Sequence, residues 1–497
     1  MPGADEWFAR ANRARVTRMR VSLVFLAGLV ALAGCTPEPA LPDLDTIYAD
    51  VARAGPDAVR RPLITVPGTL GSVLRDQESG TVVWGGGSRG LSADPDDPEE
   101  ARLIALPIAE GPVSALRDGV VPSGILDRAQ AEVLGLPVEI EVYAGILRTL
   151  TAGGFRSGTR SQIDAALTRA REDNAAGGPS VEDYASLTAA EADAFRFDYD
   201  WRRDIPALAR EFHAFVLSRK RQVAAIRSIA ERRSVDPDSI TFDLLAHSMG
   251  GLVTRYYLMY GPQPLPEDGT LPILTWEGAR HFQRVVWVAT PNAGSILAMD
   301  NLINGKSLGP FQPFYPGALL ATHVSVWQMM PRARHERVRE ANGNALDLYD
   351  PALWERHGWG LLDPEAEALR AWLMPDITDP GARLDRARRH QARLIARAKA
   401  FHAAMDRPTS PPARLETFLV VGGGFATPAA AEVDPASGSF TLTAREEGDG
   451  VVLRASVLLD ERQGGTAGGG LRTPLDVDTT LFLPDEHVEL AKDWIFG

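Results

Sequence analysis

The sequence predicts an α/β fold, a mostly parallel β-sheet with helices on both faces, together with a lid insertion and a helical cap. Two observations predict it. Short, wholly apolar segments rich in β-branched residues recur along the chain, and segments with helical spacing of apolar residues lie between them. Strands that are apolar along their length suit a sheet that is covered on both faces. Alternation of strands and helices favours parallel pairing.

The expected elements follow one another in that rhythm. The first strand ends at Pro67-Gly68, and a later strand is followed, after only a short turn, by a helix. Strands are expected at residues 61–66, 241–246, 285–289 and 417–421, and helices at residues 207–231 and 251–260.

Two segments interrupt the alternation. Residues 72–135 are rich in Gly, Pro and Asp, and residues 296–415 are mainly helical and rich in Arg. Insertions of this size into a compact sheet are commonly functional lids or caps, so we predict a lid insertion and a helical cap there. The arginines between positions 383 and 397 are expected to form a solvated helix face, with a membrane- or phosphate-contacting face as the alternative.

The N-terminal residues are expected to lie outside the folded domain. Arg18 and Arg20 precede an apolar run that is too short to span a bilayer comfortably and that ends in Leu32-Ala33-Gly34-Cys35. These four residues resemble the bacterial lipobox, so residues 1–34 are predicted to be a lipoprotein signal peptide and Cys35 the lipidation site. An ordinary signal peptide is the alternative, and Met19 would be a more typical start than Met1.

The remainder is then divided into two parts. Residues 35–60 are predicted to be a Pro-rich tether, and residues 61–497 the folded α/β domain that carries the lid (about 72–135) and the cap (about 296–415). Thr36 follows the predicted lipidation site where an acidic residue would resemble an inner-membrane retention signal. We therefore expect a monomer that is anchored through Cys35 acyl chains in a bacterial cell envelope, at the outer membrane.

Composition narrows the class of partner. A net charge of −13 argues against nucleic acid as a partner but does not exclude a membrane. The single Cys excludes an intramolecular disulfide and a Cys-based metal site. The sequence implies no metal and no organic cofactor.

The clearest chemical signal is a serine between a strand and a helix. Ser248 stands in Ala246-His247-Ser248-Met249-Gly250. A nucleophilic serine at such a corner needs small residues two positions before and after it, because the backbone is sharply folded. Ala246 and Gly250 meet this requirement, although the first position is more often glycine. The pattern predicts Ser248 as the nucleophile of an α/β-hydrolase.

A nucleophilic serine needs a base that is oriented by a carboxylate, and this fold supplies them in the order Ser, acid, His. Asp449 lies between two glycines after a strand-like stretch at residues 440–444, and it is the predicted acid. His487 is the only one of nine histidines that follows Asp449, and it is the predicted base. His247 is expected to pack in the interior. Alternative acids without the glycine pair are Asp460, Asp476 and Asp478.

An oxyanion hole requires backbone N–H groups aimed at the carbonyl oxygen of the substrate. The backbone N–H of Met249 is the first expected donor, because Met249 directly follows the serine. The second donor is expected in the glycine-containing loop after the first strand, where Thr69 is the first choice and Leu70 the second.

Several motifs, taken in order, resemble the lecithin:cholesterol acyltransferase family, which includes a lysosomal phospholipase A2 that also transacylates. The resemblance runs from about residue 61 to the C-terminus, and the motifs on either side of the serine make it specific. The matching pieces are Val-Pro-Gly-Thr-Leu-Gly at 66–71, Tyr-Asp-Trp-Arg at 199–202, Ala-His-Ser-Met-Gly-Gly at 246–251, Ala-Thr-Pro-Asn-Ala-Gly-Ser at 289–295, Gly-Asp-Gly-Val-Val at 448–452 and Glu-His at 486–487.

The resemblance implies the same nucleophile, acid and base, with Thr69 and Met249 at the oxyanion positions. It also implies a mobile lid after the oxyanion loop and a cap after the strand that ends near residue 290, where the two insertions fall. Trp201 is expected in the core, with the lining of an acyl track as the alternative, and Leu70 is a second candidate substrate contact. The lid cysteines of the animal enzymes have no counterpart here.

These inferences predict an acyltransferase or phospholipase that acts on a glycerophospholipid-like membrane lipid and passes the acyl group to an alcohol or to water. A secreted carboxylesterase or triacylglycerol lipase with the same triad is the nearest alternative. A catalytically inactive envelope lipoprotein that acts as a binding module is the alternative from another class.

Overall fold

The computed structural model of the protein describes residues 61–87, 90–126, 128–133, 136–141, 194–307, 313–461, 473–487 and 490. All of them belong to one compact unit, residues 54–497. The predicted signal peptide, Cys35 and the tether lie outside the described residues. No helix within the described ranges is both long enough and apolar enough to cross a membrane.

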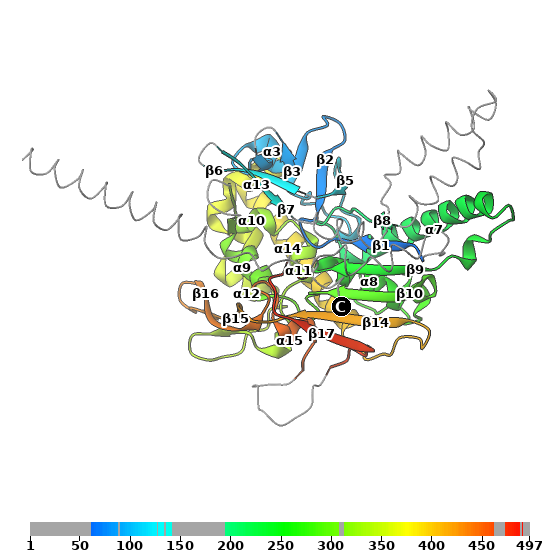
Figure 1. Cartoon of the computed structure of the whole chain (residues 1–497). Helices are drawn as coiled ribbons and strands as arrows, with labels where there is room; N and C mark the ends of the chain where they lie inside the picture. The colour runs from blue at the N-terminus through cyan, green and yellow to red at the C-terminus, as the bar shows by residue number, and fades with distance from the viewer. Residues whose placement is uncertain are drawn as a thin grey trace, which may run out of the picture. The chain divides into compact units, whose positions relative to one another are not determined.

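The core of the fold is a six-stranded sheet in which every neighbouring pair of strands is parallel (Figure 1). The strand order is β17-β14-β10-β9-β1-β8. This confirms the α/β fold with a parallel sheet. The strands are β1 (Leu63–Val66), β8 (Ala194–Arg196), β9 (Phe242–His247), β10 (Phe282–Val288), β14 (Glu416–Gly422) and β17 (Thr479–Leu483).

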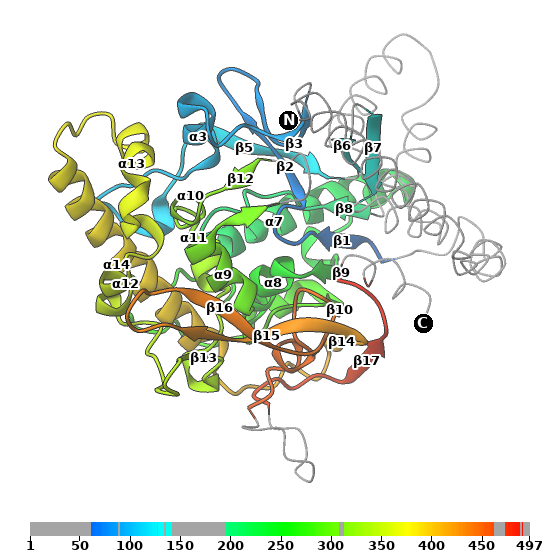
Figure 2. The same cartoon turned by 90° about the vertical axis from the view of Figure 1, so that its left-hand side faces the viewer.

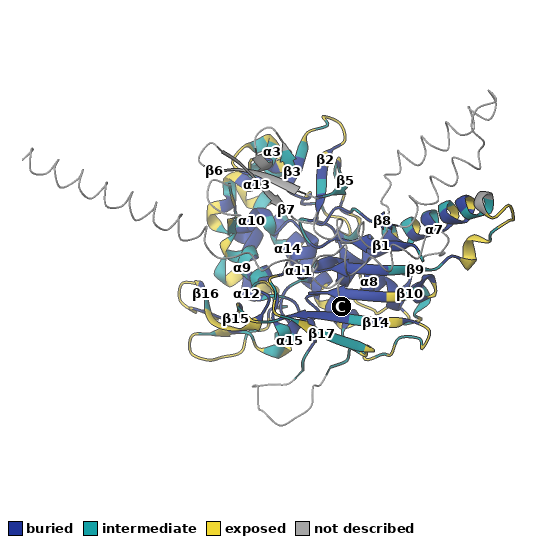
Figure 3. Cartoon of the chain, in the orientation of Figure 1, coloured by how far each residue is buried: buried dark blue, intermediate teal, exposed yellow. Residues whose placement is uncertain are grey.

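The four strands expected from apolar runs are confirmed as β1, β9, β10 and β14. Figure 3 shows these central strands as mainly buried, in keeping with their apolar sequences. The two edge strands were not expected. β8 has three residues, too few for a periodic pattern, and β17 has no fully buried residue.

Two helices pack together beside the sheet, and both were expected. In α7 (Ile205–Ala230), apolar residues at helical spacing, such as Leu208, Phe212 and Val216, are fully buried. In α8 (Met249–Tyr260), every residue is buried, because the helix is enclosed by β9, α7 and further elements. Only Ser248 separates the end of β9 from the start of α8.

The residues of the predicted lid insertion form a layer of their own. A four-stranded antiparallel sheet with the order β4-β3-β2-β5 lies beyond the β1 side of the molecule (Figure 2). The elements are β2 (Ser72–Asp76), β3 (Val82–Gly87), β4 (Gly90–Ser92), α3 (Pro98–Ile104), β5 (Val120–Ile125), β6 (Arg128–Val133) and β7 (Leu136–Glu141).

The residues of the predicted cap are mainly helical, as expected, and they begin where β10 ends. They have their own apolar core around Trp327, Trp354 and Leu394. Whether the lid and the cap are functional units stays a prediction. The elements are α9 (Ile296–Asn304), β11 (Lys306–Ser307), β12 (Phe314–Tyr315), α10 (Gly317–Leu320), α11 (Val324–Gln328), β13 (Val338–Glu340), α12 (Pro351–His357), α13 (Glu367–Leu373) and α14 (Pro380–Met405).

The arginines of α14 bind acids of this same chain. Arg389 lies 2.9 Å from Glu110, and its side chain is 56% exposed, as expected for a solvated face. Arg397 differs, because its side chain is 3% exposed and both carboxylate oxygens of Asp204 accept hydrogen bonds from it at 2.8 Å. The expectation of a uniform solvated face was therefore wrong at Arg397, which ties the cap to the start of α7.

A smaller three-stranded sheet follows the cap in the chain and carries the predicted acid. The strand expected at residues 440–444 is longer than predicted, and it pairs antiparallel with β15. Asp449 comes directly after this strand. The strands are β13, β15 (Phe425–Val433) and β16 (Phe440–Gly448), and the short helix α15 (Arg454–Val457) follows.

Candidate active site

Ser248 occupies a sharp corner between β9 and α8. Its backbone has φ 52° and ψ −125°, a conformation that a non-glycine residue rarely adopts and that the surrounding structure must hold in place. The Ser248 N–H donates to the carbonyl oxygen of Val288 in the neighbouring strand at 2.8 Å. The corner therefore presents the hydroxyl at the carboxyl end of the parallel sheet.

The glycines after the serine are required by close packing. A Cβ atom at Gly250 would lie 2.4 Å from the Pro67 carbonyl oxygen, and one at Gly251 would lie 1.8 Å from Thr290 Oγ1. Real Cβ atoms do not approach other atoms this closely. Ala246, which stands where glycine is more common, is fully buried between the neighbouring strands β1 and β10.

The structure brings Ser248, His487 and Asp449 together from distant parts of the chain. His487 Nε2 lies 2.9 Å from Ser248 Oγ, across 239 positions of sequence. His487 Nδ1 lies 2.8 Å from Asp449 Oδ2. All three side chains are buried, with Asp449 the most enclosed at 1% exposure.

Two backbone groups hold the Asp449 carboxylate. Oδ1 accepts hydrogen bonds from the N–H groups of Val451 at 2.9 Å and Val452 at 2.7 Å, and Oδ2 faces His487. Burial alone would raise the pKa of Asp449, but the neighbouring imidazole and the backbone donors outweigh it and lower the pKa overall. An ionised Asp449 accepts the Nδ1–H of His487, which leaves Nε2 free to accept the Ser248 proton.

The glycines beside Asp449 permit its position. Gly450 has φ +91°, a region that favours glycine. A Cβ atom at Gly448 would lie 2.4 Å from the Val452 carbonyl oxygen. Gly422, at the end of β14, leaves room for Asp449, because a Cβ atom there would lie 2.5 Å from the Asp449 Cβ.

His247 has a more specific place than the interior packing expected for it. Its Nε2–H donates to the backbone carbonyl oxygen of His487 at 2.9 Å, and the two rings lie 4.8 Å apart. Burial, followed by the neighbouring His487, lowers the pKa of His247 to about 3, so the ring is neutral near pH 7. His247 therefore holds the loop that carries His487, a role for which the sequence offers no signal.

The two expected oxyanion residues lie side by side next to the serine. Gly68 packs so tightly on Ser248 that a Cβ atom there would lie 2.7 Å from the Ser248 Cβ. Thr69 follows directly, and its hydroxyl lies 3.3 Å from Met249 Sδ. Leu70, the second choice, has φ 65° and therefore turns the chain away from the site.

The Tyr-Asp-Trp-Arg motif holds this loop. The Tyr199 hydroxyl donates to the Pro67 carbonyl oxygen at 2.6 Å, and the Tyr199 N–H donates to Ser72 Oγ at 3.1 Å. Trp201 Nε1–H donates to the Ser72 carbonyl oxygen at 3.3 Å. Both ends of the loop are thus fixed by one short segment, so the sequence motif is a scaffold for the loop after β1.

A second motif, at residues 289–295, braces the acid loop. The Ser295 hydroxyl donates to the Val451 carbonyl oxygen at 2.9 Å. The Asn292 side chain donates to the Val457 carbonyl oxygen at 2.7 Å and accepts from Arg255 at 3.1 Å. These bonds fix the segment that donates to the Asp449 carboxylate.

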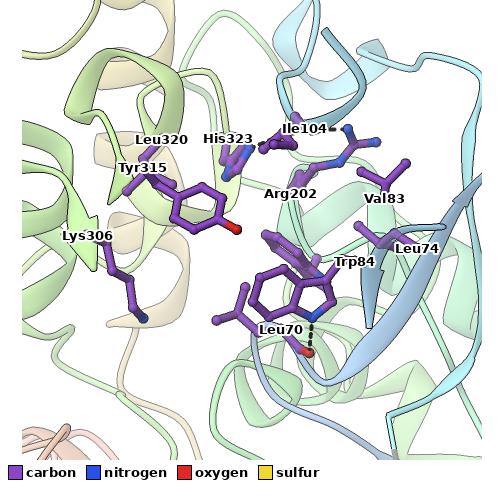
Figure 4. A pocket seen from close by; sticks show the side chains of 11 residues that line it. Leu70, Leu74, Val83, Trp84, Ile104, Arg202, Lys306, Tyr315, Leu320 and His323 are labelled. Atoms are coloured by element: carbon purple, nitrogen blue, oxygen red, sulfur yellow. Dashed lines mark hydrogen bonds between the residues drawn. The ribbon is translucent and has the colours of Figure 1, made fainter. Parts of the chain in front are cut away.

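A pocket opens beside the loop that carries Thr69, with Leu70 in its wall (Figure 4). The space between its walls, which includes open solvent, has a volume of about 420 Å³. The buried side chain of Trp201 also lines it; that Trp201 contacts an acyl chain stays a prediction. The lining residues are Leu70, Leu74, Val83, Trp84, Ile104, Trp201, Arg202, Lys306, Tyr315, Leu320 and His323. Among the residues that the structure describes, no group of three or more His, Cys, Asp or Glu side chains could hold a metal.

Comparison with solved structures finds similar chains, and the first of these shares the fold. A chain in the crystal structure of a Tle4–Tli4 complex has a TM-score of 0.50 and 16% sequence identity, over 88% of this chain and 96% of that chain. Lipase 1 from Pelosinus fermentans has a TM-score of 0.20 and 14% identity, over 51% of this chain and 67% of its own. EstA from Clostridium botulinum has a TM-score of 0.27 and 13% identity, over 93% of this chain and 97% of its own.

Comparison at the level of sequence identifies a family over one segment of the chain. No curated protein sequence matches the chain. The model of the lecithin:cholesterol acyltransferase family matches residues 189–345, a segment that contains Ser248 and the motifs at 199–202 and 289–295 but not the Gly-Asp-Gly-Val-Val motif at 448–452. The resemblance inferred from the motifs is therefore confirmed over this segment, in a chain that has the α/β-hydrolase fold.

Proposed function

We propose that the protein is a serine-dependent acyltransferase or phospholipase, which cleaves an acyl ester of a glycerophospholipid-like lipid and passes the acyl group to an alcohol or to water. The family match and the fold support the coarser statement, an acyl-ester hydrolase or acyltransferase. The observation that carries the finer proposal is the chain of contacts from Asp449 through His487 to Ser248.

The proposed reaction begins with a proton transfer. His487 Nε2 takes the proton of Ser248 Oγ as that oxygen attacks the acyl carbonyl. A C–O bond forms, and the carbonyl electrons move onto the carbonyl oxygen. The imidazolium, which Asp449 stabilises, then returns the proton to the departing alcohol. This leaves the acyl group on Ser248 Oγ as an ester.

The negative charge on the tetrahedral intermediate needs preorganised donors. The Met249 N–H lies at the N-terminus of α8, where the helix dipole favours an anion. The Thr69 N–H is the proposed second donor, and the hydrogen bonds from Tyr199 and Trp201 keep its loop in place. In the second half-reaction, water or an alcohol gives its proton to His487 as it attacks the acyl carbon; the bond from that carbon to Ser248 Oγ then breaks, and His487 returns the proton to Ser248 Oγ.

A fluorophosphonate probe tests the nucleophile. The wild-type protein should be labelled covalently at Ser248, whereas Ser248→Ala should not be labelled although it keeps its fold. Ser234→Ala is the matched control, because Ser234 is exposed and lies in the segment between α7 and β9. An unlabelled wild-type protein would support the inactive binding module instead.

Vesicles of mixed phospholipids that contain a long-chain alcohol test the substrate and the acceptor. Free fatty acid and new ester are measured together, with soluble short-chain esters as a comparison. Release of acyl groups from the vesicles supports the proposal, and the ratio of ester to fatty acid gives the preferred acceptor. Turnover of short esters alone, with none on vesicles, would favour a carboxylesterase.

We also propose that Cys35 is lipidated and anchors the protein as a monomer in the outer membrane. The support is the lipobox-like sequence at residues 32–35 and the position of the only Cys. Radiolabelled palmitate should be incorporated into the full chain and not into Cys35→Ser. A soluble wild-type protein without label would contradict this proposal without affecting the one on Ser248.

A further inference from the structure

Two cationic side chains, Lys306 and Arg202, lie in the mainly apolar wall of the pocket beside the active site, and they differ in their partners. Lys306 belongs to β11 and stands directly opposite Tyr315 of β12 in the antiparallel pair. Figure 4 shows both residues on one side of the pocket, across from Trp84, Leu74 and Val83. A charge in such a place needs a physical explanation.

Lys306 has no counter-ion within the described part of the chain. Burial lowers the pKa of its ammonium, and no acidic residue raises it again. Lys306 is only partly buried, and an anion that entered the pocket would gain a charge-assisted interaction with its ammonium. The other cation in the wall is already satisfied, because Arg202 binds the carboxylates of Asp200 and Asp118.

A second polar atom in the same wall also lacks a partner. His323 is 1% exposed, and its Nε2–H donates to the Ile104 carbonyl oxygen at 2.9 Å. Its Nδ1 has no hydrogen-bond partner among the described residues. Burial, followed by the charge of Arg202, lowers the pKa of His323 to about 4, so this nitrogen is an acceptor near pH 7. A ligand that carries a hydroxyl would satisfy it.

The remaining walls fit hydrocarbon. Trp84 and Trp201 meet edge to face at 5.6 Å, and Leu74, Val83 and Leu320 complete the apolar surface. Trp84 Nε1–H donates to the Leu70 carbonyl oxygen at 2.7 Å, which connects this wall to the loop beside Ser248. A lipid chain placed here would lie next to the proposed oxyanion donor.

We propose that this pocket selects an anionic lipid with a hydroxylated headgroup, whose anionic group pairs with Lys306 while its apolar part lies against Trp84 and Trp201. This inference rests on the proposed function, because it names the substrate class of the same site. Phosphatidylglycerol has the required chemistry: one negative charge, headgroup hydroxyls and two acyl chains.

The test compares two lipids with the same acyl chains in neutral detergent micelles. Lys306→Gln should lower kcat/KM for phosphatidylglycerol by about 10- to 100-fold, the effect of losing a hydrogen bond to a charged group. Its kcat/KM for uncharged diacylglycerol should change by less than about threefold. Lys306→Arg should retain most of the activity on phosphatidylglycerol. The matched control is Lys399→Gln, which alters an exposed lysine of α14 and should change neither value.

If Lys306→Gln lowered kcat/KM equally for both lipids, Lys306 would support only the structure of the pocket. If kcat/KM were unchanged for both lipids, Lys306 would not select a charged lipid. Either result overturns the inference. Glycerol 3-phosphate supplies the charge and hydroxyls without chains. If it competed as well as the lipid, the site would be one for a free phosphate ester and the lipid proposal would be wrong.

A binding measurement separates this inference from the proposed function. Ser248→Ala is titrated with a non-hydrolysable diether analogue of phosphatidylglycerol, and tryptophan fluorescence reports occupancy. Binding that Lys306→Gln weakens supports the inference even if the wild-type protein turns over no lipid, which would overturn only the proposed function. Turnover without charge-dependent binding overturns only the inference.

Discussion

Because of the contacts of Asp449, a single substitution can remove its effect on the orientation of His487 while the loop stays folded. Both backbone hydrogen bonds, from Val451 and Val452, end on Oδ1, whereas His487 faces Oδ2. In Asp449→Asn, the side-chain oxygen can keep the position of Oδ1 and both backbone bonds. The amide NH2 then takes the place of Oδ2. The loop is preserved, and only the atom that faces His487 changes from an acceptor to a donor.

That change reverses the preferred tautomer of His487. An NH2 group opposite Nδ1 favours the ring with its proton on Nε2, which would donate to Ser248 Oγ and could not take its proton. We expect kcat to fall by about 10⁴-fold, equivalent to about 5.5 kcal/mol in the activation free energy. The free energy of unfolding at pH 7 should fall by only about 1–3 kcal/mol, because one charge-assisted bond is lost.

The assay combines steady-state turnover of a chromogenic ester, the rate of fluorophosphonate labelling and urea unfolding. Asp476→Asn is the control, since Asp476 is an exposed acid that also precedes His487. It should match the wild-type protein in all three measurements. A folded Asp449→Asn variant with kcat within about tenfold of the wild-type value would refute the proposed role of Asp449.

Three further predictions follow from single contacts. His247→Phe keeps the ring but leaves the His487 carbonyl oxygen without its donor, so kcat should fall by up to about 100-fold; an unchanged kcat would contradict the positioning role. Gly68→Ala places a Cβ atom 2.7 Å from the Ser248 Cβ, so labelling should slow by at least about tenfold, and the free energy of unfolding should fall by about 1–3 kcal/mol because the site becomes overpacked. Asp406→Asn leaves Arg332, whose side chain is 1% exposed, without its counter-ion, and urea unfolding at pH 7 should show a loss of about 3–5 kcal/mol. Burial alone would raise the pKa of Asp406, but Arg332 and Arg334 lower it well below its usual range. The ionised Asp406 therefore contributes fully to stability above the unfolded pKa of about 3.9, and this contribution is lost as pH falls through the folded pKa. The difference in unfolding free energy between the wild-type protein and Asp406→Asn should accordingly narrow below about pH 4.

The fold and the three residues that meet at the corner could be predicted because they depend on local patterns. A buried parallel strand is apolar along its length, and the corner at Ser248 requires small residues at fixed offsets, so both features are visible in consecutive positions. The order of acid and base along the chain then reduced the candidate bases to His487. The glycines beside Asp449 were a correct signal because the turn at Gly450 needs a positive φ.

The parts that were missed depend on contacts between distant segments. The edge strands β8 and β17 are stabilised by their neighbours in the sheet rather than by their own pattern. His247 is adjacent to Ser248 in sequence, yet its partner is a carbonyl group 240 positions away. Lys306 is an ordinary lysine in sequence, and only the packing of the cap against the residues of the predicted lid places it in the pocket wall.

By itself, the sequence determined the class of fold, the serine corner and the identity of the three residues that meet there, since these follow from periodicity, glycine positions and chain order. Only the tertiary structure decided what surrounds them. It places His247 against the His487 loop and the Tyr-Asp-Trp-Arg motif against the Thr69 loop, and it puts Lys306 in the wall of the mainly apolar pocket. The physical reason is that burial and hydrogen-bond partners are properties of side chains brought together in space, and the pattern of any one segment does not contain them.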